Sequence, residues 1–132
     1  MSNNSGANSY TNYSPDPTKL VTLVRNSTNN TISVSKSWLT TTTSSLAVGA
    51  WIDFNRNGIF EAGERVINTT ASTTTPITAT FIVPTTAYNG PLTLRMRVIF
   101  STSTITDPCA TVANGEIEDY AVKIIDLAAC TT

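Results

Sequence analysis

The amino-acid sequence predicts an all-β protein in which two sheets pack around one core. From Leu20 onward, short apolar runs alternate with turn-forming residues, and no window shows a convincing 3.6-residue period. The chain has 132 residues, of which 40% are hydrophobic, which is enough for one sizeable core. Seven such runs at this spacing are typical of a sandwich.

The N-terminal residues 1–18 are expected to form an extended polar arm. This arm ends in Ser14-Pro15-Asp16-Pro17-Thr18 and holds too few apolar groups to offset the entropy of ordering it. The sandwich is expected over residues 19–127, followed by a short tail at 128–132. One domain is therefore the expectation for the chain.

Each predicted strand is a run of alternating or continuous apolar residues bounded by turn residues. The runs cover residues 20–25, 31–38, 46–54, 65–68, 77–83, 92–100 and 119–125. The alternation is clearest in 92–100, where the even-numbered residues are apolar, whereas Thr93, Arg95 and Arg97 face the other way. The runs 46–54 and 77–83 show the same pattern, so each supplies an inner face.

Composition limits the classes of partner. The formal net charge is -1 and only 13% of residues are charged, which argues against nucleic acid and anionic lipid as partners. No apolar run is long enough to cross a bilayer, so membrane insertion is not expected. The abundance of Thr, Ser and Asn, the scarcity of Lys and Glu, and a pair of cysteines favour a secreted or cell-surface protein.

The two cysteines, Cys109 and Cys130, are spaced for a disulfide. The bridge would close a loop of about 20 residues and stabilise the fold by roughly 3 kcal/mol in the chain-entropy model. The alternative is two free thiols near the C-terminal end.

The chain contains no histidine, which makes an enzyme the weakest functional class. Catalytic triads, Cys-His pairs and histidine-based zinc sites are excluded. Four carboxylates could in principle supply a glycosidase pair, which also needs a cleft and a fixed separation. They are Glu61, Glu64, Glu116 and Glu118.

One segment, residues 53–64, fits the twelve-position calcium loop. Oxygen side chains fall at positions 1, 3, 5, 9 and 12, glycine (Gly58) falls at position 6, and position 7 offers a backbone carbonyl. The expected ligands, in chain order, are Asp53, Asn55, Asn57, Ile59, Glu61 and Glu64. Asparagine at two positions lowers the charge, which favours a weak calcium site, with a Kd on the order of 10⁻⁴ M.

The alternative interpretation of this segment is an Asn57-Gly58 hairpin turn with acidic residues nearby for solubility. The match at both ends of the loop, including the terminal Glu64, favours calcium. Because the loop leaves a strand and enters a strand, calcium is expected to stiffen the fold rather than to trigger opening.

A second acidic cluster, Glu116, Glu118 and Asp119, precedes the last predicted strand. Its carboxylates either complete the calcium shell or form ion pairs with Arg95 and Arg97 on the neighbouring strand. Ion pairing is favoured for most of the cluster.

Three segments resemble the GEVED domains of large secreted and surface proteins of bacteria. They are residues 51–60, residues 90–98, and Gly115-Glu116-Ile117-Glu118-Asp119-Tyr120, and the resemblance spans roughly residues 7–126. Ile117 replaces the valine of the motif that names the family, a volume-tolerant exchange. The resemblance implies an Ig-like antiparallel sandwich that serves as a stalk, spacer or adhesive module, with neighbouring domains or subunits as partners and no catalytic role.

Two further functions stay open. In the first, the chain is a subunit of an extracellular filament, and its polar arm adds to the sheet edge of a neighbour. In the second, the sandwich is a carbohydrate-binding module whose aromatic side chains stack on sugar rings. The available aromatics are Trp38, Trp51, Tyr10, Tyr13 and Tyr88.

Overall fold

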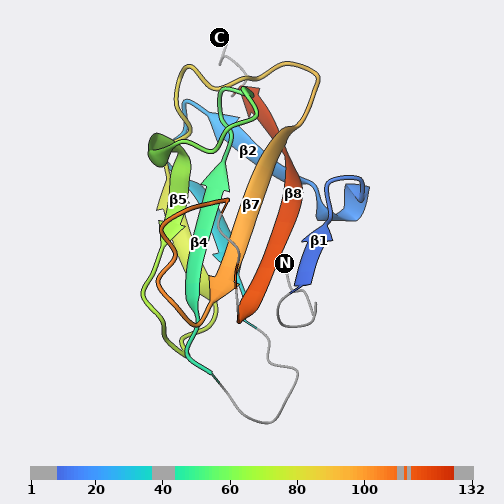
Figure 1. Ribbon diagram of the computed structural model, residues 1–132. Helices are drawn as coiled ribbons and strands as arrows, with labels where there is room; N and C mark the ends of the chain where they lie inside the picture. The colour runs from blue at the N-terminus through green and yellow to red at the C-terminus, as the bar shows by residue number, and fades with distance from the viewer. Residues whose placement is uncertain (1–8, 37–43, 110–111, 113, 127–132) are drawn as a thin grey trace.

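The computed structural model describes residues 9–36, 44–109, 112 and 114–126 and shows an all-β protein of two sheets (Figure 1). The eight strands are β1 (Ser9–Asn12), β2 (Val21–Arg25), β3 (Asn30–Val34), β4 (Ala47–Ile52), β5 (Arg65–Asn68), β6 (Ile77–Phe81), β7 (Leu94–Ser101) and β8 (Gly115–Asp126). Two short 3₁₀ helices, η1 (Pro17–Lys19) and η2 (Ala62–Glu64), connect them. No helix in these described ranges is long and apolar enough to span a membrane.

The larger sheet has the order β1-β8-β7-β4-β5, and β2 also pairs with β8. At twelve residues, β8 is the longest strand, and β1 and β2 follow one another along the same edge of it. The smaller sheet is the antiparallel pair β3-β6, which lies behind the larger sheet in Figure 1. The two layers confirm the predicted β-sandwich.

All seven predicted strands are present, but the pairing is not wholly antiparallel. Both β1 and β2 run parallel to β8. The N-terminal arm is also not separate from the sandwich. Its residues Ser9–Asn12 form β1, an additional strand that pairs with β8 in the larger sheet. The last strand begins at Gly115 rather than at Asp119, so the second acidic cluster lies inside a strand.

The main core lies between the two sheets. Alternate residues of β3 face inward, and Ile32 and Val34 are buried there. On the larger sheet, the expected inner faces of β4 and β7 are buried, with Ile52, Met96 and Val98 at 1% exposure or less. Each fully buried side chain of this size contributes about 1.5–3 kcal/mol relative to an exposed one, so this layer makes a large contribution to stability.

A second cluster covers the outer face of the larger sheet. Trp51, Ala47 and Ile99 are buried here with Ile105, and Phe60 packs against them. The segment that follows β7 folds back in front of β4, as the orange trace in Figure 1 shows. Because both faces of β4 are covered, every residue of this strand is buried.

Candidate metal centre

The predicted calcium loop connects β4 to β5 and starts at Asp53, which is 5% exposed. The Asp53 amide donates to the carbonyl of Arg95, which anchors the start of the loop on β7. Its carboxylate accepts two backbone hydrogen bonds, from the Asn57 amide at 3.1 Å and from the Gly58 amide at 2.8 Å. Gly58 has a φ of 83°, a conformation that glycine adopts without steric cost. The loop therefore curls back onto its first carboxylate.

The other end of the loop is Glu64, which is also buried and closes η2. Its carboxylate accepts from the Glu61 amide at 3.0 Å and, more weakly, from the Asn55 amide at 3.5 Å. Burial raises the pKa of Glu64, and the carboxylates of Asp53 and Glu61 add to this rise, although its two backbone hydrogen bonds oppose it. Within the part of the chain that the structure describes, Glu64 forms no ion pair.

The middle of the loop brings the three remaining polar side chains into contact with one another. The Asn55 amide group donates to Glu61 at 3.0 Å, and the Asn57 amide group donates to the other oxygen of Glu61 at 3.2 Å. All three side chains are exposed. Ile59 donates its backbone N–H to the side-chain oxygen of Asn57, and its own side chain is 61% exposed. The expected ligands are therefore joined in one hydrogen-bonded loop.

The residue types at this loop fit a hard cation, which prefers carboxylate, amide and carbonyl oxygens. Among the described residues, however, no group of three or more His, Cys, Asp or Glu side chains is gathered closely enough to hold a metal ion. The amides of Asn55 and Asn57 separate the acidic side chains of the loop, so its donor set is mixed. Asp53 and Glu64 would supply the charge, and Asn55, Asn57, Glu61 and the Ile59 carbonyl would supply neutral or outer oxygens.

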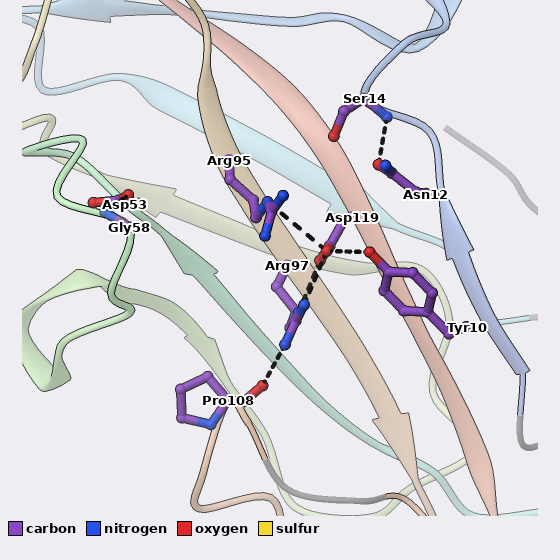
Figure 2. A network of polar contacts seen from close by, with 9 residues as sticks. All are labelled: Tyr10, Asn12, Ser14, Asp53, Gly58, Arg95, Arg97, Pro108 and Asp119. Atoms are coloured by element: carbon purple, nitrogen blue, oxygen red, sulfur yellow. Dashed lines mark hydrogen bonds and ion pairs between the residues drawn. The ribbon is translucent and has the colours of Figure 1, made fainter.

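The second acidic cluster is divided between the two faces of β8. Asp119 is completely buried on the outer face, where Arg97 binds its carboxylate with two hydrogen bonds of 2.8 and 2.9 Å (Figure 2). Arg95 lies farther away, with 3.9 Å between its Nε and the nearer Asp119 oxygen. Tyr10 donates its hydroxyl to the same carboxylate at 2.7 Å. The expected ion pairing is thus found at Asp119.

Glu116 and Glu118 face the other way, in phase with the core residue Tyr120. The Tyr120 hydroxyl donates to Glu118 at 2.6 Å, inside the sandwich. Burial, followed by the charge of Glu118, raises the pKa of Glu116 to about 7. Because Glu118 is in register with Val98 whereas the loop begins beside Arg95, neither glutamate is brought to the calcium loop.

Of the two cysteines of the predicted disulfide, the structure describes only Cys109. Cys109 is exposed, and its amide donates to the Asp107 side chain. Cys130 lies outside the described residues, so the disulfide stays a prediction.

Sequence reasoning missed the role of Tyr10, because the arm was expected to be separate from the sheet. β1 places Tyr10 beside Ile117, and its ring lies 5.9 Å from the Arg97 guanidinium. The hydrogen bond to Asp119 raises the pKa of the Tyr10 hydroxyl. The polar stretch around Tyr10 has no alternation of apolar residues that would predict a strand. The aromatic side chain of Tyr10 within this stretch was the one sign that the arm contacts the rest of the protein.

Two packed sheets and a closed acidic loop on one of them define the class of protein as a β-sandwich module. The sequence model of the GEVED domain matches residues 47–123, so the chain belongs to the GEVED domain family. No curated protein and no solved structure gives a significant match to the chain. The family match includes β4, the calcium loop, β7 and most of β8.

Proposed function

We propose that the protein is a non-catalytic extracellular module, an Ig-like sandwich that one calcium ion stabilises at residues 53–64. As part of a secreted or cell-surface assembly it would serve as a structural or adhesive unit. The observation that carries the proposal is that both carboxylates at the ends of the loop are buried, although the polar side chains between them, Asn55, Asn57 and Glu61, are exposed. Each of them accepts two backbone hydrogen bonds, and a cation between them would compensate the negative charge that burial makes costly.

Calcium would act as a tie between the end of β4 and the start of β5. Asp53 is attached to β7 through its backbone, and Glu64 leads directly into β5. An ion held by both carboxylates would fix these two points relative to each other. It would also favour the charged form of Glu64, whose pKa is raised first by burial and then by the charges of Asp53 and Glu61. Rigidity of this kind suits a spacer that transmits load between neighbouring domains.

The placement of the carboxylates supports the non-catalytic part of the proposal. A glycosidase needs two of them across a cleft. A cavity lies beside the loop, and the one described carboxylate in its wall is that of Asp53. Both Asp53 oxygens accept backbone hydrogen bonds. Glu118 lies within the sandwich.

The filament alternative has a specific structural requirement. Strand β1 already pairs with β8 of its own chain, where Tyr10 and the backbone of Tyr13 both bind Asp119. Donation of the arm to a neighbour would therefore require exchange of β1 between two copies.

The carbohydrate-binding alternative requires exposed aromatic rings, and Trp51 is not exposed. Trp51 is 2% exposed and lies under the Arg65 guanidinium, 4.5 Å from the ring centroid. Tyr13 stacks on Tyr120. Trp38 lies outside the described residues, so stacking on it stays a prediction.

Calorimetric titration with calcium tests the proposal. The wild-type protein should bind one ion with a Kd on the order of 10⁻⁴ M, and Asp53→Asn or Glu64→Gln should weaken binding by about tenfold or more, because each removes formal charge from the site. Glu116→Gln is the matched control, since Glu116 lies on the inner face of β8, and it should bind as the wild type does. Absence of binding in the wild type, or equal weakening by the control, would contradict the proposal.

A further inference from the structure

A cavity of about 290 Å³ lies beside the calcium loop, and we propose that it binds the carboxylate of an acidic sugar. Three segments form its wall. The turn after β1 supplies Ser14, the loop after β4 supplies Asp53, Arg56 and Gly58, and the third segment consists of Thr93, just before β7, and the first two residues of β7, Leu94 and Arg95. Figure 2 shows Ser14 on one side and Asp53 with Gly58 on the other, with Arg95 between them. The inference goes beyond the proposed function because it names a ligand.

Arg95 is the first of two cations at this cavity. Its side chain is 56% exposed, and its contact with Asp119 is 3.9 Å long, beyond hydrogen-bonding distance. Arg97 instead occupies the Asp119 carboxylate, with hydrogen bonds to both oxygens. The charge of Asp119 is therefore compensated mainly by Arg97, and the Arg95 guanidinium is available to a second anion.

Arg56 is the second cation, and its place at the cavity wall is fixed by two contacts. Its Nε donates to the Thr93 carbonyl at 3.1 Å, and its guanidinium lies 5.5 Å from the ring centroid of Tyr88. Its backbone has a φ of 58°, the left-handed region. Because the guanidinium is held in advance, a carboxylate that binds to it loses less freedom of the side chain.

The charge balance of the cavity favours an anion. Asp53 is the one carboxylate in the wall, and its oxygens are engaged by the amides of Asn57 and Gly58. Two guanidinium groups therefore face one carboxylate that is already hydrogen-bonded. Arginine binds carboxylates with two parallel hydrogen bonds, which gives direction as well as attraction.

The remaining wall favours a sugar acid over a simple anion. Ser14 and Thr93, which also line the cavity, carry hydroxyl groups, and hydroxyls can exchange hydrogen bonds with the hydroxyls of a sugar ring. The volume is at the small end of the range for ligand pockets, which suits one ring rather than an extended chain. A carboxylate and several hydroxyls on one ring match this wall.

The test is a titration with glucuronate, followed by backbone amide chemical shifts, in millimolar calcium and again with chelator. The wild-type protein should show saturable shifts in the loop and at the start of β7. Arg56→Gln and Arg95→Gln should each raise the Kd for glucuronate by about tenfold, because each substitution removes one charged hydrogen-bonding partner. Lys19→Gln removes a positive charge outside the cavity wall and should leave the Kd unchanged.

Two other probes make the outcome specific. The methyl ester of glucuronate should not bind, and acetate should bind more weakly than glucuronate. Equal binding of the ester or of acetate, no saturable shift, or equal weakening by Lys19→Gln would overturn the proposal. Failure of the calcium proposal would appear separately, as no heat of calcium binding, while the glucuronate shifts with chelator present would remain.

Discussion

At the scale of single residues, the most consequential group is Asp119, a fully buried carboxylate whose side chain accepts three hydrogen bonds. Arg97 holds both of its oxygens, and Tyr10 donates to one of them from β1. The hydrogen bond to Asp119 also raises the pKa of Arg97, which keeps the pair charged. Removal of one member of such a pair leaves the other charge buried and uncompensated.

Asp119→Asn should therefore lower the free energy of unfolding by about 3 kcal/mol, measured by urea denaturation. Asp126→Asn is the control, because Asp126 also pairs with an arginine, Arg25, but its side chain is 40% exposed. The loss in the control should be clearly smaller, since solvent screens an exposed pair. Equal losses would show that the Asp119 network has no special structural role.

Glu116 gives a pH dependence whose sign follows from burial. Its pKa is raised from an ordinary value of 4.5 to about 7, and its buried Oε2 has no hydrogen-bond partner within the described residues. The folded state holds the proton more tightly than the unfolded state does. The contribution of Glu116 to the free energy of unfolding is therefore fully present below about pH 4.5. It decreases as the pH rises towards 7 and does not change further at higher pH.

Glu116→Gln should remove this dependence, because glutamine stays neutral. The variant should have a higher Tm than the wild type at pH 8, and the difference between the two should shrink as the pH falls to 5. A melting series across this range checks the expectation. A difference that is the same at every pH would mean that Glu116 does not titrate in the folded protein.

At the scale of elements, the sequence patterns predicted seven of the strands but not β1, at the N-terminus. Alternation in the sixth predicted strand identified the inner face of β7, and Met96 and Val98 are buried as expected. The N-terminal strand escaped prediction because β1 is polar. Its backbone pairs with β8, and a contact 109 residues away in the sequence, from Tyr10 to Asp119, holds it in place.

In the candidate site, too, local contacts were predictable from the sequence and contacts between distant segments were not. Loop spacing predicted which residues of 53–64 would come together, because these contacts are local. The cavity beside the loop joins Ser14, Arg56 and Arg95, which lie on three separate segments. Local spacing has no information on such a meeting point. Glu118 was misplaced for a different reason, because β8 starts four residues earlier than the apolar pattern suggested, at Gly115.

Gly115 tests how tightly β7 and β8 are joined. A Cβ atom at this position would overlap the carbonyl oxygen of Phe100, a backbone atom that cannot move aside without disturbing β7. Gly115→Ala should therefore destabilise the protein by about 2 kcal/mol, measured by urea denaturation. Gly63→Ala is the control, because a Cβ there meets nothing within 4 Å, and its stability should change little. Equal effects of the two substitutions would contradict the close approach.

At the scale of the whole molecule, the loop at residues 53–64 contacts two strands of the larger sheet and the apolar cluster on the outer face of that sheet. Asp53 is attached to β7, Glu64 leads into β5, and Phe60 packs on the outer cluster around Trp51. A cation at the loop would therefore stabilise both faces of the larger sheet. By ligand linkage, calcium at ten times its Kd would stabilise the folded state by about 1.4 kcal/mol if the proposed site binds it.

The melting temperature with and without calcium tests this claim most directly. A change of about 1.4 kcal/mol corresponds to a rise of about 5 °C for a domain of this size, so the Tm in millimolar calcium should exceed the Tm in chelator by that amount. Magnesium at the same concentration should give a smaller rise, because its octahedral shell is less tolerant of a mixed donor set. The same Tm in calcium and in chelator would contradict the account.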